Sequence, residues 1–263
     1  MNNKLGNLLF IVLLNLLLFF LFACNFLALR PIPTPALPTP TSTSIPLSQQ
    51  VTLVSQLLDE TNQTPPFTIK SQIPQLAGSD DPRLASFNRR LNELVTSEVN
   101  TWRESFLQNT GPSVSSGSFL ETTYMLVSQI GELWSLKFDF HFYSAGAAHP
   151  GSYSITLNYD LGQGRELALG DLFLPNSEYL EAISRYSISE LSKEPFFDAA
   201  FTTGTDPTPD NYRSWNITPD GLLITFDEYQ VAPYAAGPQQ VVVPWAELQE
   251  LIDPQSGLAV YLK

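Results

Sequence analysis

The sequence predicts an α+β fold in which antiparallel sheets carry helices packed on one face. Two observations predict this class: several strand-like runs alternate apolar and polar residues, and a long amphipathic helix interrupts these runs. A third comes from one strand, where Phe138, Phe140 and Phe142 share a face and Asp139 and His141 lie on the other. Because a sheet with one apolar face must be covered on that face, we expect helices there.

Two early strands open the folded part of the chain. The runs "VTLVSQLL" (51–58) and "FTIKSQIPQL" (67–76) are apolar and rich in β-branched residues. Between them lies "TNQTPP" (61–66), whose polar residues and prolines indicate a turn.

A long helix follows at 82–107. Asp81 is a suitable N-cap and Pro82 suits the first helical position. Apolar residues recur at helical spacing through this segment, which predicts a helix packed against a sheet. They are Leu84, Phe87, Leu91, Leu94, Trp102 and Phe106.

Three further strands are predicted at 119–131, 133–144 and 151–161. The third alternates two sets of residues, so one face of the sheet should be core and the other polar. The apolar set is Tyr153, Ile155, Leu157 and Tyr159, and the polar set is Ser154, Thr156 and Asn158.

The C-terminal part supplies smaller elements. We expect a second helix at 175–193 capped by Asn176, and a turn at "TPDG" (218–221). Pro244 should open a short last helix, "WAELQELI" (245–252).

The N-terminus predicts attachment to a membrane. An apolar run from Leu8 to Leu29 follows a single lysine, which is typical of an export or membrane segment over residues 1–30. Within it, "LFAC" resembles the lipobox of bacterial lipoproteins and marks Cys24 for lipidation. An uncleaved transmembrane helix is the alternative, and both tether the chain. Residues 31–49, rich in Pro, Thr and Ser, predict an extended linker, so we expect the folded part outside the cytoplasm.

Composition limits the partners. The chain has 263 residues, with 13 Lys and Arg against 26 Asp and Glu, a formal net charge of −13. Nucleic acid is not an expected partner, because phosphate binding needs concentrated basic residues. A basic partner is compatible with this charge. A single cysteine leaves no internal disulfide and no thiolate metal cluster.

Residue spacing does not favour catalysis. A metal site from Asp139, His141 and His149 needs the loop to fold back, and the two histidines lack helical spacing. No Gly-x-Ser-x-Gly motif and no phosphate-binding glycine loop occur in the sequence. Asp227 and Glu228, as strand neighbours, should point to opposite faces, which is poor geometry for a glycosidase pair. We therefore expect no cofactor, no resident metal and no catalytic residue.

His149 carries two alternative hypotheses. At the tip of the small-residue loop 144–150 it can simply bond a backbone carbonyl and hold a turn. Alternatively it lies at the rim of a ligand-binding surface, where Tyr153, Tyr229 and Tyr234 add aromatic contact area. These four residues are the candidate ligand-binding residues.

Three motifs carry a resemblance to a known family. They are the small-residue loop ending in His149, the "G-x-x-L-x-L-x-D-L-F" run of 164–173, and the "F-x-x-Y-x-V-A-P-Y-A-A-G" run of 226–237. Residues 136–263 resemble the DUF3298, or RsiV-like, domain. Residues 50–135, with "FTIKSQIPQLAG" and "FNRRLNELV", are similar to the DUF4163 region that often precedes it.

The resemblance implies a function in the cell envelope. The family's domain forms the exported part of an anti-sigma factor that senses lysozyme, and accompanies the catalytic domain of some peptidoglycan deacetylases. We therefore expect a membrane-tethered, non-enzymatic module that binds a cell-wall component or a basic protein such as lysozyme. The alternative is a peptidoglycan-modifying hydrolase or deacetylase with a site near His149. A transmembrane anti-sigma factor is not expected, because it would need a cytoplasmic domain ahead of the apolar run.

Overall fold

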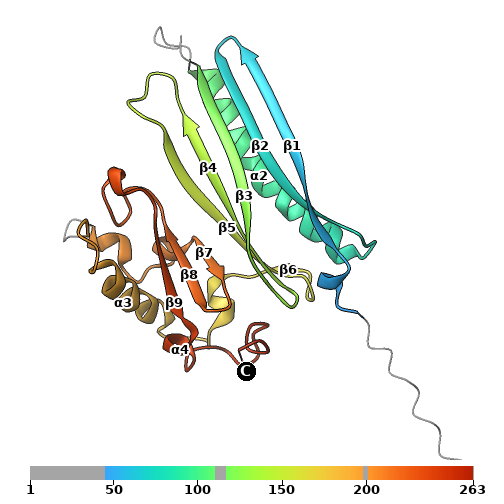
Figure 1. Cartoon of the computed structure of the whole chain (residues 1–263), viewed down its shortest axis with the longest axis vertical. Helices are drawn as coiled ribbons and strands as arrows, with labels where there is room; N and C mark the ends of the chain where they lie inside the picture. The colour runs from blue at the N-terminus through green and yellow to red at the C-terminus, as the bar shows by residue number, and fades with distance from the viewer. Residues whose placement is uncertain (1–44, 110–116, 198–200, 263) are drawn as a thin grey trace, which may run out of the picture. The chain divides into compact units, whose positions relative to one another are not determined.

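The computed structural model describes residues 45–109, 117–197 and 201–262, and the segment Ile45–Lys263 forms a compact unit (Figure 1). The predicted export segment 1–30, the lipidation candidate Cys24 and the linker up to residue 44 lie outside the described residues. Within the described part, no helix combines the length and the apolar character that crossing a membrane requires.

The first sheet has six strands in the order β1-β2-β3-β4-β5-β6. Their bounds are β1 Thr52–Gln63, β2 Pro66–Ala77, β3 Ser118–Ile130, β4 Leu133–Tyr143, β5 Gly151–Asp160 and β6 Arg165–Glu166. All neighbours are antiparallel except β2 and β3, which are parallel. The α+β class is confirmed, with this one parallel pair as a departure. Its cause is the helix between the two strands, which returns the chain to the end of the sheet where β2 began.

Helix α2 (Pro82–Gln108) covers one face of the first sheet (Figure 1). It begins as predicted, because the Asp81 carboxylate accepts a hydrogen bond from the Arg83 amide at 2.9 Å and Pro82 occupies the first turn. The Arg83 side chain also donates to Asp81, which lowers the pKa of that carboxyl to about 2. The apolar stripe of the helix is buried in the core, as the spacing predicted. Its fully or largely buried members are Leu84, Phe87, Leu91, Leu94, Val95, Val99 and Phe106.

A second, antiparallel sheet has the order β7-β8-β9. Its strands are β7 Trp215–Ile217, β8 Gly221–Phe226 and β9 Gln239–Pro244, and helices α3 (Tyr179–Leu191) and α4 (Trp245–Leu248) share its core. The "TPDG" turn joins β7 to β8, where the Thr218 hydroxyl accepts from the Gly221 amide at 3.1 Å.

Three local predictions need correction. Asn176 does not cap α3: it has a φ of 62° in the preceding loop, and Glu178 occupies the cap position without a side-chain bond. Strand β1 continues to Gln63, so the first turn is confined to Thr64 and Pro65. The last helix ends at Leu248, four residues earlier than predicted.

The polar face of the first sheet is only partly exposed. We call the face opposite α2 the open face. Near β7 it is covered, because buried Ser135 and Asn158 bond each other at 2.6 Å, and the Asn216 side chain donates to the Ser135 hydroxyl at 2.9 Å. The Asn158 amide also donates to the Trp215 carbonyl at 2.8 Å. This face therefore holds the two sheets together at one end, where the alternation alone predicted only that the face is polar.

Candidate ligand-binding site

Two loops bring three of the four candidate residues together. We call His149, Tyr229 and Tyr234 the rim cluster: His149 ends the β4–β5 loop, and the tyrosines follow β8. The centre of the Tyr234 ring lies 4.1 Å from that of the His149 ring and 5.6 Å from that of the Tyr229 ring. His149 is exposed and Tyr229 is 57% exposed. The cluster is thus an accessible aromatic surface.

Hydrogen bonds orient the His149 imidazole. Its Nδ1 lies 2.7 Å from the Pro150 carbonyl oxygen, which can only accept, so Nδ1 carries the proton. Nε2 lies 3.4 Å from the Tyr229 hydroxyl, a long contact in which the hydroxyl donates. The Tyr234 hydroxyl donates to the same Pro150 carbonyl at 2.9 Å. Both hypotheses for His149 find support here, because it bonds a backbone carbonyl and also lies on the aromatic surface.

Tyr229 adopts a left-handed backbone conformation, with a φ of 66°, which residues other than glycine rarely adopt. The turn is held by the Gln230 amide, which donates to the Asp227 carbonyl at 3.1 Å. The Gln230 side chain in turn donates to the carbonyls of Gly204 and Asn211, at 3.1 and 2.9 Å. Such strain persists only where the surroundings fix it, and it is concentrated at functional positions.

The two carboxylates before Tyr229 tie its loop to β5. Strand β8 ends at Phe226, so Asp227 and Glu228 are not strand neighbours on opposite faces, and that prediction was wrong. Asp227 accepts from the Ser154 amide at 2.9 Å, and Glu228 accepts from the Ser152 hydroxyl at 2.6 Å. Both carboxylates are therefore engaged in fixing the loop.

Tyr153 does not join the rim cluster. It faces α2, where its hydroxyl donates to Glu98 at 2.6 Å and accepts from the Trp102 indole at 2.9 Å. Its ring stacks on Phe140 at 5.1 Å, and burial raises the pKa of its hydroxyl. The sequence contained this signal, since Tyr153 shares its strand face with the core residues Ile155 and Leu157.

The metal arrangement that the sequence left open is not assembled. Asp139 pairs with Lys137 at 2.6 Å and accepts from the Ser154 hydroxyl at 2.8 Å. Among the residues that the structure describes, no group of three or more His, Cys, Asp or Glu side chains is placed to hold a metal ion.

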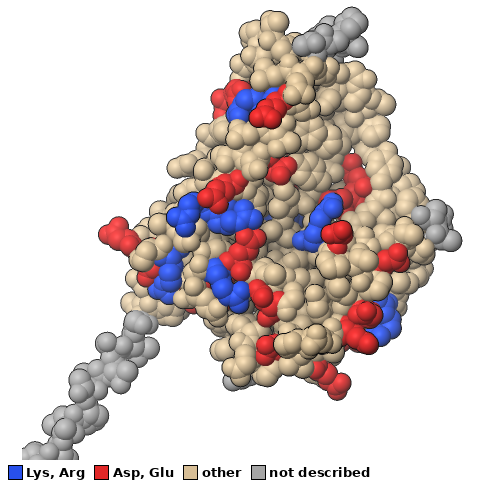
Figure 2. All heavy atoms as spheres, turned by 180° about the vertical axis from the view of Figure 1, so that it is seen from behind, with Lys and Arg blue, Asp and Glu red and all other residues tan. Residues whose placement is uncertain are grey.

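Charges of both signs occur on the helical side of the first sheet. On the side that carries α2, basic and acidic side chains are interspersed (Figure 2). The arginines of this helix are paired: Arg90 lies 2.5 Å from Glu166, and Arg103 lies 2.7 Å from Glu60. This side is not a continuous acidic surface.

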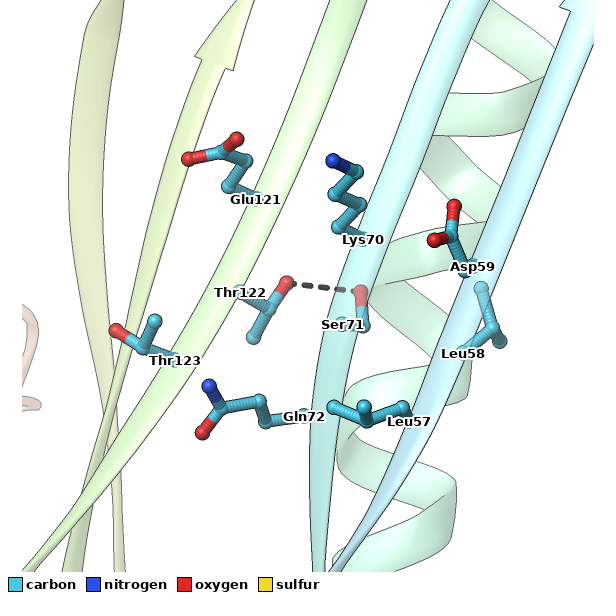
Figure 3. Close-up of a pocket in the computed structure, with 9 residues that line it drawn as sticks. All are labelled: Leu57, Leu58, Asp59, Lys70, Ser71, Gln72, Glu121, Thr122 and Thr123. Atoms are coloured by element: carbon cyan, nitrogen blue, oxygen red, sulfur yellow. Dashed lines mark hydrogen bonds between the residues drawn. The ribbon is translucent and has the colours of Figure 1, made fainter.

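Sequence reasoning missed a hollow on the open face. It has a volume of about 270 Å³ and lies over β1, β2 and β3 (Figure 3). Lys70 points into this region between Asp59 and Glu121, each from a different strand. The pairing of strands so distant in sequence was not visible in the sequence alone.

The fold defines a small α+β domain. Residues 170–246 match the family described as Protein of unknown function (DUF3298), so the chain contains a DUF3298 domain. The resemblance is confirmed there, while the DUF4163-like region at 50–135 stays a prediction.

Two solved structures share the fold. A DUF3298 family member from Bacteroides fragilis superposes with a TM-score of 0.60 at 15% identity, covering 81% of this chain and 97% of that one. A DUF3298 family protein from Pseudomonas aeruginosa PAO1 gives 0.54 at 16% identity, covering 78% and 95%. At these identities the likeness shows the fold alone.

Curated relatives match over part of the chain. The peptidoglycan-N-acetylmuramic acid deacetylase PdaC of Bacillus subtilis is 28% identical over 139 residues, which cover 52% of this chain and 30% of the relative. The esterase Rv3036c of Mycobacterium tuberculosis is 30% identical over 116 residues, covering 44% and 50%. The immunogenic protein MPB64 of Mycobacterium bovis is 25% identical over 109 residues, covering 41% and 48%. The chain therefore spans at most half the length of these relatives.

Proposed function

We propose that this protein is a non-enzymatic binding module, tethered to the membrane and facing the extracytoplasmic side. It recognises a cell-wall component or a basic protein such as lysozyme. The observation that carries the proposal is the rim cluster, an exposed aromatic and histidine surface fixed on two anchored loops.

The rim cluster suits recognition better than turnover. Tyrosines supply large contact areas with few rotatable bonds, and binding hot spots are enriched in them. Here the Tyr229 and Tyr234 rings stack, and the loop that carries them is tied to β5 by Asp227 and Glu228. A surface that is already ordered loses little entropy when a ligand binds.

Charge and the N-terminal sequence support the partner and the location. A net charge of −13 attracts basic proteins and speeds their association. The apolar run from Leu8 to Leu29 and Cys24 support a membrane tether, and the Pro/Thr/Ser-rich linker supports a domain held away from the membrane.

Binding by residues 45–263 tests the proposal, with lysozyme and soluble peptidoglycan fragments as separate ligands. We expect Tyr229→Ala and Tyr234→Ala each to weaken binding about tenfold or more. Tyr261→Ala is the matched control, because Tyr261 is an exposed tyrosine near the C-terminus, outside the rim cluster. Absence of binding to both ligands, or binding that neither rim variant weakens, would refute the proposal.

A peptidoglycan-modifying hydrolase or deacetylase with a site near His149 is the second candidate. It is favoured by the 3.4 Å contact between the Tyr229 hydroxyl and His149 Nε2, and by relatives named as a deacetylase and an esterase. It predicts that residues 45–263 act on wall material or acyl esters, with or without added zinc, and that His149→Ala removes the activity. Inactivity on all these substrates would dispose of this candidate.

A further inference from the structure

A row of polar side chains crosses the open face of the first sheet. Direct strand pairing places Asp59 opposite Lys70, Lys70 beside Glu121, and Glu121 opposite His141. His141 in turn lies opposite Ser152 on β5. Because neighbouring strands are about 4.8 Å apart, this polar row spans roughly 19 Å from β1 to β5. Its far end reaches the rim cluster, where Ser152 bonds the residue before Tyr229.

The ionisable groups of the polar row are not used within the protein. In the described part of the chain, every Lys and Arg except Lys70 and Arg185 forms an ion pair. Lys70 lies between Asp59 and Glu121, yet it pairs with neither of them. None of these three side chains makes a hydrogen bond to another described residue. Their hydrogen-bonding capacity is therefore open to water and to a ligand.

The hollow beneath the polar row adds amide, hydroxyl and apolar groups. Figure 3 shows Gln72 and Thr123 on the side of the hollow away from Lys70, with Leu57 beside them. Leu57 is 79% exposed, so it offers apolar surface. The buried Ser71 and Thr122 point to the opposite face of the sheet, where the Ser71 hydroxyl donates to the Thr122 hydroxyl at 3.2 Å and joins β2 to β3. A volume of about 270 Å³ lies at the small end of ligand pockets, which suits one sugar ring rather than a folded protein segment.

An aromatic pair extends the same face. Phe119 and Tyr143 lie opposite each other on β3 and β4, two residues along from Glu121 and His141, with ring centres 6.1 Å apart. Aromatic rings provide apolar area for the C–H face of a sugar next to its hydrogen-bonding groups.

We infer that the polar row and its hollow bind an oligosaccharide of N-acetylated amino sugars. The carboxylates of Asp59 and Glu121 accept hydrogen bonds from ring hydroxyls, and the Lys70 ammonium donates to an acetamido carbonyl. The inference rests on the proposed function, because it names the class of wall component and adds a surface distinct from the rim cluster.

Other ligand classes fit the charges less well. Two carboxylates beside one lysine repel polyanions, which argues against nucleic acid and acidic glycans. The central Lys70 opposes a strongly cationic protein segment at the same place. A neutral ligand that offers both hydroxyl donors and carbonyl acceptors uses all three groups.

Calorimetric titration of residues 45–263 with triacetylchitotriose, and with maltotriose as a sugar lacking acetamido groups, tests the inference. We expect triacetylchitotriose to bind at least about tenfold more tightly, since a hydrogen bond to a charged group contributes on this order. Asp59→Asn and Glu121→Gln should each weaken it about tenfold. Lys70→Met should also reduce the preference for triacetylchitotriose over maltotriose, because the carbonyl contact is lost.

Matched controls separate this surface from general charge effects. Glu104→Gln on α2 and Lys193→Met after α3 change the same charges elsewhere, and should leave binding unchanged. Failure of triacetylchitotriose to bind, or binding that only rim variants weaken, overturns the inference. If lysozyme or peptidoglycan fragments still bind in that case, the proposed function survives; if nothing binds, both fail.

Discussion

The buried amide of Asn158 should be among the most sensitive polar positions in the fold. It is 2% exposed, and its side chain makes three hydrogen bonds, one to β4 within the first sheet and two to β7 of the second sheet. It accepts from the Ser135 hydroxyl at 2.6 Å and the Ile217 amide at 3.2 Å, and donates to the Trp215 carbonyl at 2.8 Å. At about 1 kcal/mol net for each bond, Asn158→Ala should lower the free energy of unfolding by about 3 kcal/mol.

A second substitution distinguishes hydrogen bonding from packing. Asn158→Leu fills the space but leaves the Ser135 hydroxyl and the Trp215 carbonyl without this partner, so it should be no more stable than Asn158→Ala. Urea unfolding, followed by circular dichroism and tryptophan fluorescence, measures the free energies. Asn92→Ala, an exposed asparagine on α2, is the control and should change stability by less than about 0.5 kcal/mol. A loss below about 1 kcal/mol for Asn158→Ala, or recovery in Asn158→Leu, would refute the argument.

Three further predictions concern strain, capping and the core. Tyr229→Gly should be about 1 kcal/mol more stable than Tyr229→Ala in urea unfolding, because both lose the ring and only alanine keeps a Cβ at a φ of 66°; equal stability would contradict the strain. The pKa of Asp81 is about 2 in the folded protein against an ordinary value of 3.8. The ionised carboxylate therefore stabilises the folded state above about pH 4, and this stabilisation is lost as the pH falls toward 2. The difference in melting temperature between wild type and Asp81→Asn should therefore shrink over this range, and a constant difference would exclude the linkage. Phe138→Ala, in the core under α2, should cost about 3–5 kcal/mol in urea unfolding, and Phe119→Ala on the open face markedly less; similar losses would contradict the assignment of the two faces.

Local rules were sufficient where the chain itself sets the conformation. Asp81 and Pro82 start α2 because the cap bond and the proline ring act within one turn. Asn176 failed as a cap although its type was suitable, because the loop places it in a left-handed conformation two residues too early. Period-two alternation correctly separated the two faces of β4 and β5. It could not show that β7 covers Ser135 and Asn158, since a polar residue can face either water or a partner amide.

The candidate site shows the same division between local and distant information. His149, Tyr229 and Tyr234 were predicted together, and the structure places them together. Tyr153 was included as a source of aromatic contact area, although its alternation with Ser154 already placed it on the core face.

The polar row shows why the remainder could not be predicted. It depends on the register between β2 and β3, which places Lys70 beside Glu121 although a helix of 27 residues separates the strands. No pattern within either strand encodes that register.

The packing of the second sheet explains why the two proposed surfaces lie on one face. Through Asn216 and Trp215, β7 covers the polar face of β4 and β5 at one end. Through Asp227 and Glu228, the loop after β8 binds the same strand β5 further along. Neither contact involves Asp59, Lys70 or Glu121, which stay exposed on the open face, and the rim cluster lies at the border of this region. A glycan lying across the strands along the polar row would therefore extend toward Tyr229, so both surfaces can contact one polymer.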